Sequence, residues 1–491
     1  MKHSEKKQEP SLTKNFIVYF VRTVVSVLVP IITFPYASRI LGPSGIGRVQ
    51  YAQTWVTYFQ LFACLGINSY AIREGTRCRD DKEKLGKLCT EIFRINCMTT
   101  VLAYAAFFIF WHSFGPIKDY KGLLLLFSLS IAANALSIEW VYSIFEDYTY
   151  ISIRSVLFQI LSLLALFLLV NDQQDYYMYA IVLMLPAIGT AMTNIVHARK
   201  LISWGGKREY HYLYHLKPII LIFGITIASN LYNSLDTTML GLQMGDTAVG
   251  YYTSAVKLAR NVLVIVTSMC TVLSPRAFYY AGLDDKSKFL ELTKKATNVI
   301  LGFAIPCGIG LIVLAPQLIS LFSGPEFGAA VQPMRVLSIN LIFSAVNGLL
   351  GWQVLVTLNK EKWTFAAMIV GCVIDFVLNS LFIPLYGVTG AAAATLLTEM
   401  SVFVAYMLLA KRLMAIGQCF VEVWQYLVGV VAFFPIAFYV NCVVGKNEVV
   451  TVAVTVVLCA AEYAIVLITL HNPLVERVKE KVAGIVSHRG G

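Results

Sequence analysis

The sequence predicts an all-α integral membrane protein with about fourteen transmembrane helices. Only 14% of its 491 residues are charged and 58% are hydrophobic, and the mean hydropathy is +0.69. This leaves too few polar residues to cover the surface of a soluble fold of that size. The apolar stretches reach about 20 residues, the length that a helix needs to cross about 30 Å of hydrocarbon.

The apolar stretches form two sets of six followed by a final pair. The first set covers 15–40, 47–69, 90–112, 122–145, 151–171 and 177–198. The second set covers 218–241, 248–275, 297–321, 332–357, 364–385 and 388–410, and the pair covers 421–442 and 449–470. We therefore predict an N-terminal tail (1–14), a first lobe (15–205), a linker (206–217), a second lobe (218–415), two C-terminal helices (416–470) and a C-terminal tail (471–491).

The distribution of basic residues predicts the orientation of the chain. The first tail and the loops near 70–89, 199–217 and 276–296 are rich in Lys and Arg. The loops on the other side carry Lys118, Lys121 and Lys446. Because basic loops stay in the cytoplasm, both termini are expected there. The same distribution explains the net charge of +11 without a nucleic-acid partner.

Loop lengths and motifs argue against catalysis. Every predicted outer loop is short, and the inner loops are too short to fold alone. No phosphate-binding loop is found, and the cysteines show no disulfide or metal pattern. His211 and His215 are four residues apart, but they lie in a basic loop. We predict a protein that is not an enzyme, with no catalytic residue, cofactor or metal site.

Two related hairpins indicate an internal repeat. Residues 39–52 and 238–255 share a Leu-Gly pair, a later Gly and an Ala five residues beyond it. We expect the second copy to carry a four-residue insertion. The sixth and twelfth segments end alike, in Ala198-Arg-Lys-Leu and Ala410-Lys-Arg-Leu. Two bundles of six helices that repeat in this way are a common plan for secondary transporters, which hold the substrate between the bundles.

Seven charged residues inside the predicted spans are candidates for function, because a charge at mid-bilayer costs about 2.5–3.5 kcal/mol. They are Arg22, Glu139, Asp236, Lys257, Arg260, Asp375 and Glu399. The three cations have no obvious acidic neighbour, so we expect them to line a cavity that selects phosphate or diphosphate. The alternative is a set of ion pairs, for example Arg22 with Asp236. The acids Asp236, Glu139 and Glu399 are candidates for proton or sodium coupling.

Polar residues on the predicted helices are expected to line the same cavity. The candidates are Gln53, Thr57, Asn230, Asn233, Asn261, Asn340 and Asn347. They recur at helical spacing on the second predicted helix and on the seventh and eighth, and Asn340 and Asn347 line up on the tenth. The alternative for each one is a hydrogen bond from helix to helix.

The stretch Pro35–Ala52 resembles the first hairpin of Wzx-type polysaccharide flippases of the multidrug/oligosaccharidyl-lipid/polysaccharide superfamily. Asp236–Gly241 followed by Gly250–Ala255 resembles the start of that family's second lobe. The resemblance implies a V-shaped pair of lobes in the bacterial plasma (inner) membrane. It also implies cavity cations at Arg22, Arg48, Lys257 and Arg260.

The cargo that this resemblance implies is an undecaprenyl-diphosphate-linked oligosaccharide, such as a polysaccharide or O-antigen repeat unit. It would move from the inner to the outer leaflet by alternating access. Implied partners are membrane lipid, a proton or sodium ion, and other polysaccharide assembly proteins.

Two other functions remain open. A cation-coupled multidrug exporter of the same superfamily would prefer an acidic cavity. A membrane glycosyltransferase or polymerase would need a larger outer domain than these loops allow.

Overall fold

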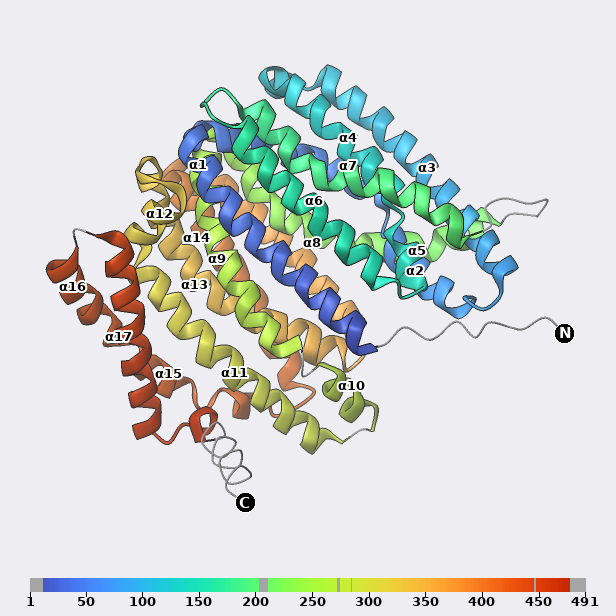
Figure 1. Ribbon diagram of the computed structural model, residues 1–491. Helices are drawn as coiled ribbons and strands as arrows, with labels where there is room; N and C mark the ends of the chain where they lie inside the picture. The colour runs from blue at the N-terminus through green and yellow to red at the C-terminus, as the bar shows by residue number, and fades with distance from the viewer. Residues whose placement is uncertain (1–11, 203–210, 272–273, 284, 446, 477–491) are drawn as a thin grey trace. The chain divides into compact units, whose positions relative to one another are not determined.

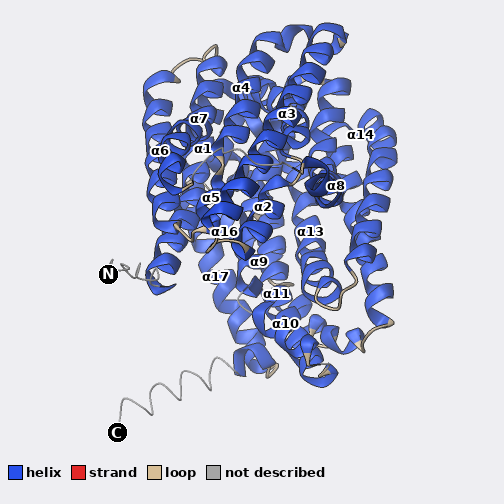
Figure 2. Ribbon diagram, turned by 90° about the vertical axis from the view of Figure 1, so that its right-hand side faces the viewer, coloured by secondary structure: helices blue, strands red, loops and turns tan. Residues whose placement is uncertain are grey.

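The computed structural model describes residues 12–202, 211–271, 274–283, 285–445 and 447–476, and these ranges contain helices and no strands (Figure 2). Residues 1–11 of the predicted tail, 206–210 of the predicted linker, Lys446, and 477–491 of the C-terminal tail lie outside the described residues. The chain forms two compact units, Met1–Ser234 and Leu235–Gly491. We call them unit 1 and unit 2.

Unit 1 is a bundle of long helices around α1. Its elements are α1 (Leu12–Cys64), α2 (Ile67–Arg77), α3 (Lys82–Ser113), η1 (Gly115–Tyr120), α4 (Lys121–Ser137), α5 (Glu139–Ile144), α6 (Tyr148–Leu169), α7 (Tyr176–Leu201) and the first part of α8 (Tyr212–Met244). Helix α1 contacts α3, α4 and α6, and α7 packs on both α4 and α6 (Figure 1).

Unit 2 is centred on α13. Its elements are the end of α8, α9 (Asp246–Thr271), α10 (Ser274–Gly282), α11 (Lys286–Val313), α12 (Ala315–Ser323), η2 (Pro325–Ala330), α13 (Val331–Gly348), η3 (Leu349–Val356), α14 (Glu361–Lys411), η4 (Ile416–Phe420), α15 (Val423–Gly429), α16 (Phe433–Val444) and α17 (Glu448–Thr469). Helix α13 contacts α9, α11 and α14. Element η3, which continues α13, is a π-helix.

Each predicted apolar segment falls on these helices. The first two segments share α1, which kinks at Gly42 (φ 65°), and the eleventh and twelfth share α14, which kinks at Gly387 (φ 59°). Within the described ranges, ten helices are long and apolar enough to cross a membrane. The all-α membrane fold is confirmed.

The structure changes the predicted register of the repeat. Gly42 and Gly245 both have positive φ and both sit at the turn of the first hairpin of their unit. The separation between Gly42 and Gly245 equals that between Gly47 and Gly250, so the predicted four-residue insertion is wrong. The sequence comparison paired Gly42 with Gly241, but the glycine that shares the left-handed conformation of Gly42 is Gly245.

Both units begin their third long helix with the same cap. Asp81 accepts hydrogen bonds from the backbone N–H groups of Glu83 and Lys84, each at 3.0 Å. Asp285 accepts one from the N–H of Lys288 at 3.0 Å. These backbone N–H groups stabilise the carboxylates and lower the pKa of both side chains. The cap is a second structural sign of the repeat.

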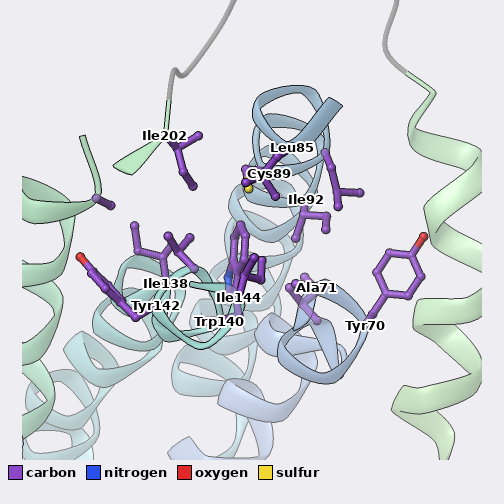
Figure 3. Packing of buried hydrophobic residues seen from close by; sticks show 14 of the residues in the cluster. Tyr70, Ala71, Leu85, Cys89, Ile92, Ile138, Trp140, Tyr142, Ile144 and Ile202 are labelled. Atoms are coloured by element: carbon purple, nitrogen blue, oxygen red, sulfur yellow. The ribbon is translucent and has the colours of Figure 1, made fainter. Parts of the chain in front are cut away.

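A buried apolar cluster joins α2, α3 and α5 in unit 1 (Figure 3). Trp140 and Ile144 of α5 share this cluster with Ala71 of α2 and Ile92 of α3. Gly75 permits this contact, since a Cβ there would lie 2.2 Å from the Cδ1 atom of Ile144. The cluster therefore fixes the short helix α5 against its neighbours.

The start of α8 is anchored to the edge of this cluster. Glu91 of α3 accepts the backbone N–H of His211 at 2.6 Å and lies 2.9 Å from Nε2 of His215. The hydroxyl of Tyr70 lies 2.6 Å from Nδ1 of the same ring. These bonds explain why the first turns of α8 belong to unit 1 and why the boundary between the units falls inside that helix.

Candidate functional site

Three charged side chains meet inside unit 1. Glu139 opens α5 and lies between Arg154 of α6 and Arg22 of α1. Its Oε1 atom is 2.6 Å from Nη2 of Arg154, and its Oε2 atom is 3.8 Å from Nη2 of Arg22. The carboxylate is thus shared by two guanidinium groups, held closely by one and loosely by the other.

A strained backbone break aims Glu139 at these partners. Ile138, the residue between α4 and α5, has φ 38° and ψ 35°. This left-handed conformation is unfavourable for a β-branched residue. Ile138 is 3% exposed and belongs to the apolar cluster of Figure 3, so packing holds the break in place. The predicted fourth segment (122–145) is for this reason two helices.

Arg154 is fixed more firmly than Arg22. Its side chain is 5% exposed, whereas that of Arg22 is 25% exposed. Arg154 also donates to the side-chain oxygen of Asn194 on α7 and lies 5.5 Å from the centre of the Tyr150 ring. The Nδ2 group of Asn194 in turn donates to the carbonyl of Ser137.

This network alters two expectations. Arg22 does have an acidic neighbour, Glu139. Its ion-pair partner is therefore Glu139, and Asp236, the suggested partner, bonds to neutral side chains instead. Because two arginines share one carboxylate, the group carries a net positive charge, and Arg154 already compensates Glu139 at the shorter distance. Arg22 consequently keeps its capacity to bind another anion.

Arg48 lies toward the other end of unit 1. Its guanidinium carbon is 5.1 Å from the ring centre of Tyr176 and 5.7 Å from that of Tyr120. Tyr120 ends η1 and Tyr176 begins α7, while Arg22 lies beside the start of α6. A helix of the length of α6 spans about 33 Å, so in this conformation Arg22 and Arg48 do not contact the same phosphate.

Unit 2 buries an acidic cluster at the contact of α8, α9 and α14. Asp236 accepts a hydrogen bond from Nδ2 of Asn379 at 2.7 Å and one from the hydroxyl of Tyr252 at 2.5 Å. The hydroxyl of Thr395 lies 3.0 Å from the same oxygen of Asp236. Asp375 interacts electrostatically with Asp236. The side chains of this cluster are thus carboxyls, hydroxyls and an amide.

The second carboxyl of the cluster is incompletely bonded. Thr398 donates to Oδ1 of Asp375 at 3.2 Å. In the described part of the chain, Oδ2 of Asp375 and Oδ1 of Asn379 have no hydrogen-bond partner, although the two residues are 1% and 0% exposed. Two adjacent carboxyls in an apolar interior favour uptake of a proton or a hard cation.

The two predicted cations of unit 2 lie on α9. Lys257 is half-buried and Arg260, three residues on, is exposed. No ion pair to Arg260 is recorded among the residues that the structure describes. Both cations follow Tyr252 of the acidic cluster on the same helix.

The other predicted polar residues have mixed surroundings. The side chains of Gln53, Thr57, Asn230 and Asn261 are partly exposed. Asn340 donates to Ser344 at 3.4 Å. Asn347 donates to the carbonyl of Glu399 at 2.9 Å and to its carboxylate. Asn233 lies in α8, but its side chain is outside the described residues.

Sequence reasoning missed several members of both networks. Arg154 is charged and lies in a predicted span, so the rule that selected Arg22 could have found it. Asn379 follows Asp375 by one helical turn, a visible signal. Asn194, Tyr252 and Thr395 are common polar residues, and only their three-dimensional partners distinguish them. Within the described residues, no group of three or more His, Cys, Asp or Glu side chains could hold a metal ion.

Charged groups buried inside apolar helices of both units are typical of an integral membrane transporter. Residues 12–280 match the family of polysaccharide biosynthesis proteins. The chain belongs to that family. Residues 222–381 also match the MatE family.

Relatives in sequence cover most of the chain. An O-antigen transporter of Escherichia coli (strain K12) is 24% identical over 400 residues, which is 79% of this chain and 94% of the relative. The capsular polysaccharide biosynthesis protein CapF of Staphylococcus aureus is 24% identical over 412 residues, 82% of this chain and 100% of the relative. The match therefore spans both units. The long apolar helices of the described ranges make the protein a membrane protein with several crossings.

Among solved structures, the lipid II flippase MurJ in an inward closed conformation has a similar fold. The TM-score is 0.72 at 16% sequence identity, over 93% of this chain and 100% of that chain. An inward-facing multidrug resistance MATE family transporter gives a TM-score of 0.59 at 14% identity, over 82% and 98% of the two chains. These similarities confirm the fold class that the sequence predicted.

Proposed function

We propose that the protein moves an undecaprenyl-diphosphate-linked oligosaccharide from the inner to the outer leaflet of the bacterial plasma membrane. Family membership and the names of the O-antigen and capsular polysaccharide relatives support this cargo. Both termini face the cytoplasm in this proposal, because the basic loops lie on their side. The lipid tail stays in the bilayer, and no covalent bond changes.

The observation that carries the proposal is the charge of the group formed by Arg22, Glu139 and Arg154. It holds two guanidiniums and one carboxylate, and Arg22 is its most exposed cation. A guanidinium in low dielectric binds phosphate oxygens strongly, often through two parallel hydrogen bonds. The group lies at the start of α5 and α6, which the proposed orientation puts on the cytoplasmic side. Arg22 would therefore meet the diphosphate first.

The remaining predicted cations act later in the proposed cycle. Lys257 and Arg260 supply positive charge from unit 2 to the alternating-access pathway. Arg48 belongs to the end of unit 1 away from Arg22, so we assign it to the release half of the cycle.

The acidic cluster of unit 2 is the proposed site of the coupling ion. Asp236 was a candidate from sequence, and its bonding partners support the choice over Glu139, which Arg154 neutralises, and Glu399, which Asn347 binds. The carboxyl, hydroxyl and amide oxygens of this cluster suit a proton or a sodium ion.

The test is a complementation experiment in a strain that lacks the gene. The charge reversals Arg22→Glu, Lys257→Glu and Arg260→Glu should each cause lipid-linked oligosaccharide to accumulate on the cytoplasmic leaflet. Lys82→Glu, which reverses an exposed lysine in the first turn of α3, is the matched control and should restore surface glycan. Normal surface glycan in all three reversals would refute the cationic cavity.

A second candidate function is the export of cationic drugs. The acidic cluster of unit 2 and the match of residues 222–381 to the MatE family favour it. A drug-sensitivity panel on the deletion strain separates the two functions. In a strain whose glycan assembly is blocked upstream, deletion of a flippase gene leaves drug sensitivity unchanged. Deletion of a drug exporter gene sensitises the cell whether or not glycan assembly is blocked.

A further inference from the structure

Glu139 is divided unequally between its two arginines, and this asymmetry has a functional meaning. The pair with Arg154 is short, at 2.6 Å, and Arg154 is buried. The pair with Arg22 is long, at 3.8 Å, and Arg22 is more exposed. Coulomb attraction rises as distance and dielectric fall, so most of the charge of Glu139 is balanced by Arg154.

The two arginines also differ in their other bonds. Arg154 is oriented by Asn194 and by the face of the Tyr150 ring, in addition to Glu139. Among the residues that the structure describes, the guanidinium of Arg22 forms an ion pair with Glu139 and with no other residue. Arg154 is thus a fixed member of the group, and Arg22 is the member that can turn toward a ligand.

We propose that Arg154 is a positioning residue that sets how strongly Glu139 holds Arg22, and that Glu139 occupies Arg22 until a phosphate group replaces it. This inference rests on the proposed function and specifies how its first anion contact works. A diphosphate carries more negative charge and more acceptor oxygens than one carboxylate. It therefore displaces Glu139 from Arg22, while Glu139 remains compensated by Arg154.

The inference predicts the effect of removing Arg154. Without its charge, Glu139 would be an uncompensated carboxylate in an apolar interior and would draw Arg22 into a close pair. The cargo would then compete with a stronger internal anion. Removing the charge of Glu139 as well should release Arg22 again. A residue that acts only in packing would show no such rescue.

The experiment uses the full-length protein in nanodiscs and measures the binding of undecaprenyl diphosphate, with undecaprenol as the uncharged control. Arg154→Gln should weaken binding about tenfold, within the range of ordinary coupling energies. Arg154→Gln/Glu139→Gln should bind within about threefold of the original chain. Arg154→Lys, which keeps the charge, should lie close to the original chain. Equal weakness in the single and the double variant would overturn the proposal.

A second readout does not depend on the cargo. Phenylglyoxal modifies exposed arginines, and the rate at Arg22 can be followed by mass spectrometry. The rate should fall in Arg154→Gln and recover in the double variant. This pattern without any binding of undecaprenyl diphosphate would refute the proposed function and leave the role of Arg154 intact. If the original chain binds undecaprenyl diphosphate and the rate of Arg22 modification is unchanged in Arg154→Gln, the role of Arg154 is refuted and the proposed function is not.

The single variant could fail to fold, because Arg154 is buried. Size-exclusion profiles and thermal unfolding identify such a failure. In that event the comparison of Glu139→Gln with the original chain decides. The inference requires faster modification of Arg22 and binding at least as tight as before, and slower modification or weaker binding would overturn it.

Discussion

The two units repeat one helical plan but bury opposite charges. Unit 1 places two arginines around one glutamate, whereas unit 2 places Asp236 and Asp375 among neutral amide and hydroxyl groups. The caps at Asp81 and Asp285 and the turns at Gly42 and Gly245 show how closely the scaffolds correspond. The two units therefore differ at their buried polar positions, while their helix ends are alike. We expect anion recognition in unit 1 and ion coupling in unit 2.

The largest expected effect separates the units by their response to ions. Asp236→Asn or Asp375→Asn should remove a stabilisation by sodium or protons that the original chain shows. An ion present at 100 times its dissociation constant adds about 2.7 kcal/mol to the free energy of unfolding. The measurement is the unfolding temperature in sodium and in potassium salts at several pH values. Asp80→Asn, an exposed loop substitution, is the control, and the same ion response in Asp236→Asn would contradict the assignment.

A pair of glycines tests whether the units are equally rigid. At Gly390 of α14, a Cβ would lie 2.1 Å from the backbone oxygen of Phe382, across the kink at Gly387. At Gly75 of α2, it would meet the end of the Ile144 side chain, which can move. Gly390→Ala should lower the free energy of unfolding by about 1–3 kcal/mol, and Gly75→Ala should lower it by less. Thermal unfolding of the two variants measures the difference, and a larger loss at Gly75 would show that the apolar cluster of unit 1 cannot adjust.

Arg48 sharpens the location of the anion site within unit 1. Its contacts with Tyr120 and Tyr176 should make Arg48→Lys cost about 0.5–1 kcal/mol of stability. Undecaprenyl diphosphate binding should change little, because Arg48 lies far from Arg22 in this conformation. Binding and thermal unfolding of this variant answer both points. A loss of binding as great as that in Arg22→Glu would place the two cations at one site.

The smallest effect concerns the shared caps. The pKa of Asp81 and Asp285 is lowered in the folded protein because backbone N–H groups bind their carboxylates. A group with a lowered folded pKa stabilises above its unfolded pKa and loses this contribution as pH falls through the folded pKa. Asp81→Ala and Asp285→Ala should therefore each lower the unfolding temperature slightly at neutral pH and not at strongly acidic pH. Unequal effects of the two variants would show that the caps are not equivalent.

Much of the fold could be predicted from sequence, because membrane helices must be long and apolar. The order of the segments from 15–40 to 449–470 followed from this rule, and the relation between the two halves followed from their similar first hairpins. The break at Ile138 could not be predicted, because apolar packing stabilises a backbone conformation that the residue itself disfavours. The repeat register was misjudged because Leu-Gly occurs at both 41–42 and 240–241, and only the turn at Gly245 distinguishes the right glycine.

The candidate site was predicted less completely than the fold. Charge inside a predicted span singled out Arg22, Glu139 and Asp236. Their partners depend on which helices touch, which composition does not reveal. Glu139 shows what sequence alone cannot reveal. Its position in a predicted span fits a proton carrier, whereas its contacts with Arg22 and Arg154 make it an ion-pair partner.

The most direct test is the flipping rate of a fluorescent undecaprenyl-diphosphate oligosaccharide in proteoliposomes with imposed sodium or proton gradients. The original chain should show a rate that depends on the gradient. Arg22→Glu should be inactive at every gradient, and Asp236→Asn should bind the cargo but lose the dependence. If Arg22→Glu flips the lipid at the original rate, positive charge in unit 1 does not recognise the cargo.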